Sequence, residues 1–496
     1  MNIGGNMKKK YILAIDEGTT SARAAVFDIE KNEIVNMHSV KIGQIYPSSG
    51  WVEQDANEIY SAQIAALEKC LEMGIGAHEI VGLALTNQRE TVVAWDRISG
   101  QPIYNAINWQ CRRTAKKINS LSEEERKLIR EKTGLIPDAY FSATKMRWIY
   151  DNVPKAKELE KEKRLCMGTI DSFLLYRLTG EFVTDATNAS RTMLYNIKEG
   201  KWDKELLSLF GVKKEWLAQV VDSNCVVGKT TLSCGKVDVA GILGDQQAAL
   251  FGQCCFEKGM VKNTYGTGCF MLANIGDTLE NTSEKLLTTI AYQIDGKTTY
   301  AYEGSVFNAG SIMTWLKDGL KIFDNTNQIE ELASRVKSPN GVYFIPALTG
   351  LGSPYWDSAA RGAFLGLDRG TNRCHMIRAC LEAVAYRAED MMQEMRDSGI
   401  EVKSLRCDGG MTKNNLLMQL QADLSRVDIL IPRTTESTIL GACFMCALAM
   451  GTFKSLDDIA FRWVEMARFL PGRNSRIQKD YKKWKRGVAV ARKWRV

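Results

Sequence analysis

The sequence predicts an α/β protein built from two related halves, and three observations support this. The chain has 496 residues, 45% hydrophobic and 25% charged, which suits two or three folded domains and excludes disordered or fibrous classes. Apolar runs of strand length alternate with longer runs of helical periodicity, as in α/β proteins. A strand, a Gly/Thr turn and a second strand occur near residue 18 and again near residue 267.

The first half opens with a predicted hairpin. Residues 11–15 are an apolar run, and strand character resumes over 21–28 after a Gly-Thr-Thr turn that joins the two strands. Apolar residues at helical spacing predict a helix over 56–73. Two more strands are predicted over 80–85 and 91–95.

The second half repeats this opening. A strand over 260–264 leads into a Gly-Thr-Gly turn, and a second strand follows over 269–274. Helical periodicity returns over 377–395. The repeat is short, but it indicates that each half offers one hairpin to a shared cleft.

We place the boundary between the halves near residues 252–258, after a helix-like run over 246–251. This gives a predicted N-terminal domain of residues 1–252 and a C-terminal domain of residues 253–496. No Pro-rich or low-complexity linker marks the boundary, and the nine prolines of the chain argue against long disordered connections.

The net charge of +7 belongs to the end of the chain. Residues 461–496 contain twelve Lys or Arg and two acids, so the residues before them carry a slight excess of acids. That main part has no basic surface suited to a polyanion, so no nucleic-acid partner is predicted. Apolar residues at three- and four-residue steps in the tail predict a helix with a solvated basic face.

The sequence favours a cytoplasmic protein without membrane insertion. No apolar run reaches the roughly 18 residues of a membrane span, and residues 1–10 lack the apolar stretch of a signal peptide. The thirteen cysteines include no paired CxxC motifs, and with three histidines a zinc site is not expected. Free thiols are typical of a reducing compartment.

The first chemical motif is DEGTTS (residues 16–21), closed by Arg23. Backbone N–H groups in a tight Gly turn and the hydroxyls of Thr19, Thr20 and Ser21 suit phosphate oxygens, and Arg23 could pair with a phosphate through two hydrogen bonds. Asp16 could hold a metal ion, since Mg²⁺ prefers oxygen ligands. The alternative is an ordinary hairpin turn.

Two glycine-rich turns extend this pattern. The turn at residues 266–268 permits close backbone approach and would face the first turn as a second phosphate clamp. The Asp408-Gly409-Gly410 turn, followed by Asn414, fits close packing against a flat base or sugar. The alternative for this last motif is a helix N-terminal turn with a capping residue.

Polar residues next to strands form a fourth set, in the stretches 87–90, 109–112, 138–145 and 244–247. The neighbours Arg89 and Glu90 offer both donors and acceptors, as a polyol needs. Asp245 follows an apolar run and opens a helix, which suits a general base. The alternatives are a surface salt bridge for Arg89 and Glu90, and a helix cap for Asp245.

Several long stretches carry a resemblance to a known family, in one order from about residue 8 to the final helix. The most distinctive are DEGTTSARA (16–24), TNQRET (86–91), PIYNAINWQCRR (102–113), GDQQAALFGQ (244–253), KNTYGTGCFML (262–272) and DGGMTKNN (408–415). In these stretches the chain resembles the FGGY carbohydrate kinases, and among them those that phosphorylate glycerol. The resemblance implies two actin- and hexokinase-like (ribonuclease H-like) α/β domains with the active site in the cleft between them.

The resemblance also implies a reaction, the transfer of the γ-phosphoryl group of ATP to glycerol, and a homodimer or homotetramer. Asp245 would accept the proton of the attacking hydroxyl, and Asp16 would position Mg²⁺. The residues implied for glycerol are Arg89, Glu90, Trp109, Tyr140, Asp245, Gln246 and Phe270. Those implied for ATP are Thr19, Thr20, Ser21, Arg23, Thr267, Gly310, Gly410 and Asn414.

Two departures from the family concern the nucleotide. Glu17 stands where the family usually has Gln. We expect the Glu17 carboxylate either to join the water shell of the metal or to weaken ATP binding. Thr314 stands where the family has another Gln near the nucleotide, so the resemblance does not imply that nucleotide contact in this chain. Three alternatives stay open: a kinase for another polyol or ketose, an actin-like or chaperone-like ATPase that binds a protein, and a catalytically silent regulator.

Overall fold

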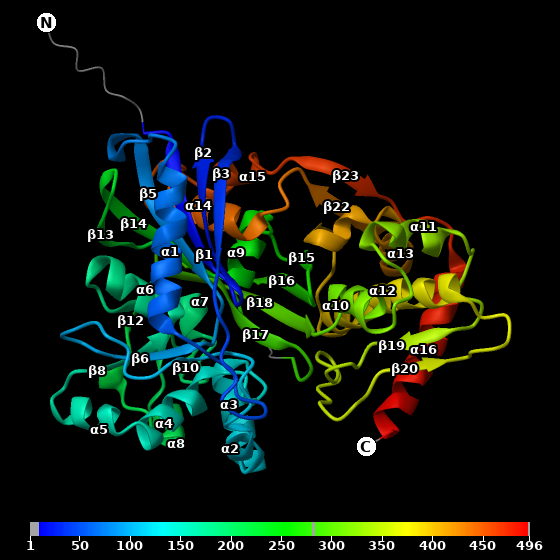
Figure 1. Ribbon diagram of the computed structural model, residues 1–496, viewed down its shortest axis with the longest axis horizontal. Coiled ribbons are helices and arrows are strands. Elements are labelled where there is room, and N and C mark those ends of the chain that lie inside the picture. Colours follow the sequence, from blue (N-terminus) through cyan, green and yellow to red (C-terminus); the bar gives the residue numbers. More distant parts are fainter. Residues whose placement is uncertain (1–8, 280–282, 495–496) are drawn as a thin grey trace, which may run out of the picture.

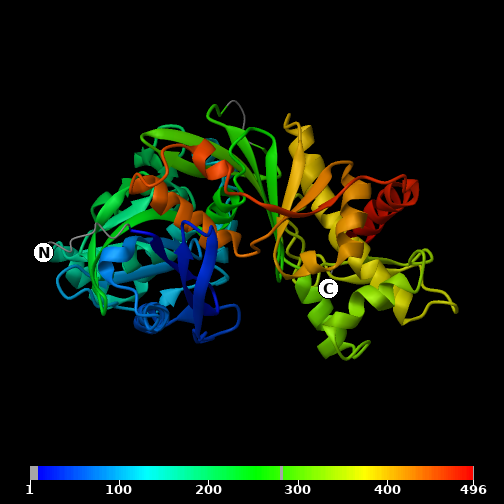
Figure 2. The same cartoon turned by 90° about the horizontal axis from the view of Figure 1, so that it is seen from above.

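A computed structural model describes residues 9–279 and 283–494. Two large sheets dominate it, one in each half of the chain, and Figures 1 and 2 show the two halves side by side. The predicted lack of a signal peptide concerns residues 1–10, of which 1–8 lie outside the described part. Within the described ranges, no helix has both the length and the apolar character needed to cross a bilayer.

The first sheet has six strands in the order β13-β14-β5-β1-β2-β3. β1, β2 and β3 form an antiparallel meander, and β5 and β14 add to it parallel to β1. The strands are β1 (Tyr11–Glu17), β2 (Ser21–Asp28), β3 (Glu33–Lys41), β5 (Ile80–Asn87), β13 (Val226–Leu232) and β14 (Gly235–Gly244).

The second sheet has seven strands in the order β17-β18-β16-β15-β21-β22-β23 and repeats that plan. β16 lies antiparallel between β15 and β18, as β2 lies between β1 and β3, and β21 and β22 add to this group parallel to β15. The strands are β15 (Met260–Tyr265), β16 (Cys269–Gly276), β17 (Leu287–Ile294), β18 (Lys297–Val306), β21 (Ser404–Asp408), β22 (Asp428–Pro432) and β23 (Glu465–Phe469).

This shared topology confirms the α/β class and the internal repeat that the two Gly/Thr turns predicted. Both predicted hairpins form, β1 with β2 and β15 with β16. β5 and the central part of β1 are mostly apolar and buried because helices cover both faces of the sheet, and β1 ends in two buried acids, Asp16 and Glu17.

Helices from both halves of the chain cover the first sheet. α1 packs on β2 and β3, and α6 packs on β13, while α14 packs on β14, β5 and β1 together with α9. In Figure 1, α14 lies among the strands of the first sheet although it comes late in the chain. The helices are α1 (Ala56–Leu71), α6 (Ile170–Thr179), α9 (Asp245–Gly252) and α14 (Ser437–Ala449).

Two glycines allow α9 and α14 to pack closely. A Cβ on Gly441 would lie 1.8 Å from the carbonyl oxygen of Ala248, and one on Gly252 would lie 2.0 Å from that of Ser437. A side chain at either position would therefore force the helices apart. α14 belongs to the second half of the chain but packs on the sheet of the first half. The domain boundary between residues 252 and 253 stays a prediction.

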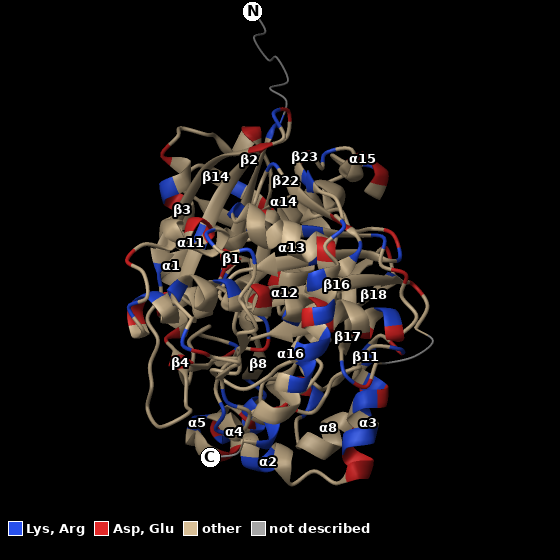
Figure 3. Cartoon of the chain, turned by 90° about the vertical axis from the view of Figure 1, so that its right-hand side faces the viewer, with Lys and Arg blue, Asp and Glu red and all other residues tan. Residues whose placement is uncertain are grey.

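The second sheet is covered by α12 (Arg373–Asp397), α13 (Asn415–Ser425) and the C-terminal helix α16 (Ser475–Lys493). α12 is the helix predicted over 377–395, and it begins four residues earlier because Asn372 caps it. In α16, Trp484 and Val488 are buried while its Lys residues are exposed, as the predicted basic face requires (Figure 3).

A smaller four-stranded sheet, in the order β4-β7-β6-β8, lies beside the first sheet. Its strands are β4 (Glu53–Gln54), β6 (Val92–Asp96), β7 (Ala106–Ile107) and β8 (Leu165–Thr169). Helices from residues 115–161 pack around it and include α4 (Ser142–Asn152). This region carries the predicted polyol residues that follow β5 and β7.

Candidate active site

The ends of three parallel strands bring the first site residues together. β1, β5 and β14 run in the same direction, and Asn87 at the end of β5 is level with both Glu17 and Gly244. Arg89 follows β5 and Asp245 follows β14, so both emerge at the same edge of the sheet. In α/β sheets, ligands commonly bind at this edge.

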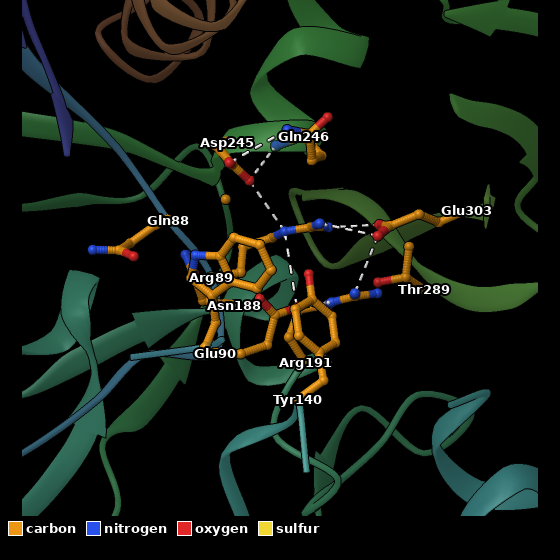
Figure 4. Close-up of polar contacts among 12 residues, drawn as sticks. Gln88, Arg89, Glu90, Tyr140, Asn188, Arg191, Asp245, Gln246, Thr289 and Glu303 are labelled. Carbon is orange, nitrogen blue, oxygen red and sulfur yellow. Dashed lines mark hydrogen bonds and ion pairs between the residues drawn. The ribbon is translucent and has the colours of Figure 1, made fainter. Parts of the chain in front are cut away.

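Arg89 occupies the centre of the site (Figure 4). Its Nη1 and Nη2 donate to the two carboxylate oxygens of Glu303 at 2.6 and 3.0 Å, and its Nε lies 3.1 Å from Asp245 Oδ1. Both Arg89 and Glu303 are buried. Burial opposes ionisation of Glu303, but Arg191 and Arg89 outweigh it and lower its pKa to about 2.

Glu90 is held by a second arginine. Its Oε1 accepts from Arg191 Nε at 2.6 Å, and Arg89 Nε is 4.0 Å from the same oxygen. Glu90 has a left-handed backbone (φ 65°), and its carbonyl oxygen accepts from Ser142 Oγ and Lys145 Nζ. Because Arg89 and Glu90 are buried, the alternative of a surface salt bridge is wrong.

Asp245 begins α9 and points toward Arg89. Its Oδ1 accepts from the Gln246 backbone N–H at 2.7 Å, and its Oδ2 from Gln246 Nε2 at 3.3 Å. The N-cap of α9 is Gly244, so the predicted alternative of a helix cap is wrong for Asp245. Burial raises the pKa of Asp245 above its ordinary value, and Arg89 opposes this increase.

Two aromatic rings lie next to this polar group. The rings of Trp109 and Tyr140 meet edge to face at 5.4 Å, and Tyr140 also lies 5.9 Å from the Arg191 guanidinium. Trp109 Nε1 donates to Thr19 Oγ1 at 2.9 Å. Two residues implied for glycerol, Trp109 and Tyr140, therefore lie next to the first predicted phosphate turn.

Gln246 and Phe270 extend the set into the second half. Gln246 Oε1 accepts from Lys262 Nζ at 2.6 Å, and Lys262 lies on β15. Phe270 is half-buried on β16, level with Ser305 of β18.

The first glycine turn connects β1 and β2 at residues 18–20. The Gly18 N–H donates to the carbonyl oxygen of Ser21 at 3.0 Å, which closes the turn. Thr20 is exposed, while Thr19 and Ser21 are half-buried. The Thr20 hydroxyl is thus open to a ligand, whereas that of Thr19 already accepts from Trp109.

Arg23 lies beside this turn, level with Asp16 across the hairpin. Its Nη2 pairs with Asp16, and its Nη1 donates to Glu436 Oε2 at 2.8 Å. These pairs engage two of the five N–H groups of the guanidinium, so a phosphate would bind the other N–H groups of Arg23 or replace one of the two carboxylates.

The second turn packs against the start of α10 (Gly310–Thr314). The Gly310 N–H donates to the Gly266 carbonyl oxygen at 3.0 Å, and the Ser311 N–H to that of Thr267 at 3.1 Å. A Cβ on Gly310 would lie 2.6 Å from the Gly266 oxygen. Thr267 is exposed, so its hydroxyl is open to a ligand.

The third turn follows β21. Gly410 is exposed, and no atom of another described residue, its chain neighbours aside, would lie within 4 Å of a Cβ placed on it. Asn414 Oδ1 accepts from the Leu417 N–H at 2.9 Å, so this residue is the N-cap of α13. The predicted alternative of a capped helix is therefore correct for Asn414, while Gly410 leaves room for a flat group.

Asp16 and Glu17 offer oxygen atoms to a cation. Both are buried; Glu17 Oε1 accepts from Gln88 Nε2 at 2.8 Å, and Oε2 has no hydrogen-bond partner among the described residues. Burial raises the pKa of Glu17 well above its ordinary value, and the Gln88 hydrogen bond opposes this. No group of three or more His, Cys, Asp or Glu among the described residues could hold a metal. The acids suit Mg²⁺ that keeps water and phosphate ligands.

Sequence reasoning assigned no role to Glu303, Arg191 or Lys262, which complete the buried network. For Glu303 and Lys262 the signal was a charged residue inside a predominantly buried strand, since such residues are rarely buried unless paired. Arg191 lies in TNASRTM (187–193), a further stretch in which the chain resembles the FGGY family. The strand pattern could not predict which residues, distant in the sequence, these three charged side chains pair with.

A cavity of about 730 Å³ lies elsewhere, between the ends of α12 and α13 and the start of α16, and none of the predicted site residues lines it. It is lined by Glu389, Gln393, Arg396, Gly399, Ile400, Glu401, Val402, Leu424, Ser425, Arg426, Val427 and Gln478. The polar network, and not this cavity, therefore marks the candidate site.

Comparisons with known proteins find full-length similarity to carbohydrate kinases. The chain is 50% identical over 492 residues to a glycerol kinase of Deinococcus radiodurans and 48% identical over 500 residues to one of Carboxydothermus hydrogenoformans, covering 98% or more of each chain. A crystal structure of Plasmodium falciparum glycerol kinase with ADP matches with a TM-score of 0.90 and 32% identity over 98% of both chains. A ligand-bound xylulose kinase from Lactobacillus acidophilus, at 23% identity and a TM-score of 0.85, shares the fold.

Profiles of a single family match most of the chain. The N-terminal domain of the FGGY family of carbohydrate kinases matches residues 11–252, and its C-terminal domain matches residues 261–450. Together with the two-sheet topology and the relatives of equal length, these matches show that the chain belongs to the FGGY family of carbohydrate kinases.

Proposed function

We propose that this chain is a glycerol kinase, which transfers the γ-phosphoryl group of ATP to glycerol and yields sn-glycerol 3-phosphate and ADP. The observation that carries the proposal is the Asp245 carboxylate, held at 3.1 Å by buried Arg89 at the ends of β5 and β14. Full-length similarity to glycerol kinases supports glycerol as the acceptor.

In the proposed reaction, Asp245 accepts the proton of a terminal glycerol hydroxyl. The hydroxyl oxygen then bonds to the γ-phosphorus, and the bond to the bridging oxygen breaks, so that ADP leaves with the bonding electrons. Arg89 and the Gln246 backbone N–H orient the carboxylate before the proton arrives. Phosphoryl transfer depends mainly on such positioning and on charge stabilisation.

The two glycine turns bind the ATP phosphates in this proposal. Exposed Thr20 and Thr267 present hydroxyls, and Arg23 contributes a positive charge. Asp16 would hold Mg²⁺, which when bound offsets the negative charge of the phosphates. Gly410 lets the adenosine approach the backbone after β21.

Selectivity for glycerol follows from the shape and polarity of the residues proposed to surround it. In this proposal Trp109 and Phe270 cover the carbon side of glycerol. The hydrogen-bonding groups come from Arg89, Glu90, Tyr140, Asp245 and Gln246. A site built to bind several hydroxyls rejects an analogue that lacks one, because a buried polar group then loses its partner.

The proposal includes a cytoplasmic enzyme that assembles as a homodimer or homotetramer. All thirteen cysteines lie in the described ranges and are free thiols, as expected in a reducing compartment.

A coupled assay for ADP formation tests the proposal. The purified chain, with ATP and Mg²⁺, is given glycerol, erythritol, xylulose or dihydroxyacetone in parallel. We expect glycerol to give the highest kcat/KM. Higher turnover with another acceptor would move the assignment within the family, and ADP formation that no acceptor stimulates would reject kinase activity.

A further inference from the structure

A buried lysine lies between the proposed base and the second phosphate turn. Lys262 is on β15, four residues before Gly266, and its side chain is fully buried. Its Nζ donates to Gln246 Oε1 at 2.6 Å and to Thr264 Oγ1 at 3.2 Å. Burying an ammonium group is unfavourable unless it is paired, and these two hydrogen bonds supply partners for Lys262.

The contact with Gln246 fixes the direction of an amide. An ammonium group can only donate hydrogen bonds, so the oxygen of the Gln246 amide must face Lys262. Its nitrogen then faces the other way, and Gln246 Nε2 lies 3.3 Å from Asp245 Oδ2. In the opposite orientation, two donors would meet at Lys262 and two acceptors would meet at Asp245.

We propose that Lys262 is a positioning residue for phosphoryl transfer, which locks the Gln246 amide so that its nitrogen donates to the Asp245 carboxylate and leaves that carboxylate ready to accept a proton. This inference rests on the proposed function. Arg89 holds Oδ1 of the same carboxylate from the other side. Lys262 therefore acts on the base from the second sheet, and Arg89 acts from the first.

The charges around Lys262 favour its ammonium form. Burial lowers its pKa to about 8, while the carboxylates of Asp408, Asp245 and Glu303 oppose the decrease. At neutral pH the side chain therefore still carries its proton and can only donate. Through Gln246, Lys262 connects the strand that ends in the second phosphate turn to Asp245, the residue that receives the hydroxyl proton.

A double-mutant cycle on the full-length enzyme tests whether Lys262 acts through Gln246. Lys262→Met, Gln246→Ala and the double variant are compared with wild type for kcat, KM for glycerol and KM for ATP. We expect Lys262→Met to lower kcat/KM for glycerol by roughly tenfold to a hundredfold, the scale of a misplaced catalytic group. KM for ATP should stay within about twofold of wild type, a change smaller than the loss of one hydrogen bond.

The decisive result is the double variant. If Lys262 works through Gln246, adding Lys262→Met to Gln246→Ala should cost little further activity, because the two effects are not additive. The same fold loss in both backgrounds would overturn the proposal, as would a rise in KM for ATP as large as the loss with glycerol. A purely structural role would lower Tm and leave kcat/KM of the folded enzyme unchanged.

A second variant covers a failure of Lys262→Met to fold. Gln246→Glu keeps a partner for Lys262 but turns a carboxylate oxygen toward Asp245, so we expect it to be less active than Gln246→Ala. Equal or higher activity would contradict the proposal. Wild-type enzyme without glycerol-dependent ADP formation would reject the proposed function itself, whereas an active wild type with an equally active Lys262→Met would reject only the role of Lys262.

Discussion

Asp245 is the residue on which the proposed chemistry depends most directly. The side chain of Asp245 is 31% exposed, while Arg89 and Gln246 hold its carboxylate in place. A protonated carboxyl cannot accept a proton, so activity should fall as pH drops through the pKa of Asp245. Because burial raises that pKa above the ordinary value of 3.8, the fall should begin at a higher pH than for a free aspartate.

The matching substitution is Asp245→Asn. We expect kcat to fall by roughly a hundredfold to ten-thousandfold, the usual contribution of a general base, and the residual rate to lose its acid limb. Asp238→Asn, earlier in β14 and paired with Lys229 away from the site, should keep the wild-type pH profile. If the rate of Asp245→Asn fell at low pH just as the wild-type rate does, the general base would be another residue.

Glu17 gives a second prediction at the scale of a single residue. Its Oε2 is buried next to Asp16, without a hydrogen-bond partner in the described part of the chain. Because burial raises the pKa of Glu17, folding at neutral pH must either protonate this carboxyl or bury its charge. Glu17→Gln removes that cost, so the free energy of unfolding at neutral pH should rise by about 1–2 kcal/mol. If Glu17 contributes to the metal's surroundings, the Mg²⁺ dependence of KM for ATP should also change. An unchanged Mg²⁺ profile would contradict that role.

Among the elements, the β15–β16 turn and α10 form one packed unit around the second phosphate turn. A Cβ on Gly310 would meet the Gly266 carbonyl oxygen at 2.6 Å, closer than side chains tolerate. Gly310→Ala should therefore push the turn and the helix apart, raise KM for ATP and lower Tm. Steady-state kinetics with ATP and a thermal melt measure the two effects.

Gly410→Ala is the matched control, because no atom of another residue that the structure describes, its chain neighbours aside, lies within 4 Å of its added Cβ. Its free energy of unfolding should stay within about 0.5 kcal/mol of wild type, as for most surface changes. A rise in KM for ATP in this variant would then report contact with the nucleotide. A drop in Tm equal to that of Gly310→Ala would contradict the steric argument.

Across the whole molecule, Glu303 ties the two halves together. It lies on β18 of the second sheet, and its carboxylate accepts from Arg89 and Arg191 of the first half. Glu303→Gln would leave two buried guanidinium groups short of a counter-charge. We expect a loss of roughly 3–5 kcal/mol in the free energy of unfolding, the usual effect of breaking a buried ion pair.

The control for this substitution is Glu257→Gln. Glu257 also pairs with a cation, Lys403 at 3.2 Å, but its side chain is 72% exposed. An exposed pair contributes about 0–1 kcal/mol, so this variant should unfold close to wild type in urea. Equal losses in the two variants would show that burial does not decide the strength of these pairs.

The sequence by itself determined the local elements and the chemistry of the turns. Strand, turn and helix follow from side-chain periodicity and glycine placement, which act over a few residues, so β1, β2, β15, β16 and α12 were predictable. The same holds for Asp245 at the start of α9, because a strand end that opens a helix is a local pattern.

Only the tertiary structure decided which charges meet. Arg89 and Glu303 are far apart in the chain, and nothing local indicates that their side chains share one buried network with Arg191. The packing of α14 on the first sheet and the contact of Lys262 with Gln246 are equally non-local. Burial converts these contacts from weak surface pairs into strong constraints, because a charge removed from water must find its partner inside the protein.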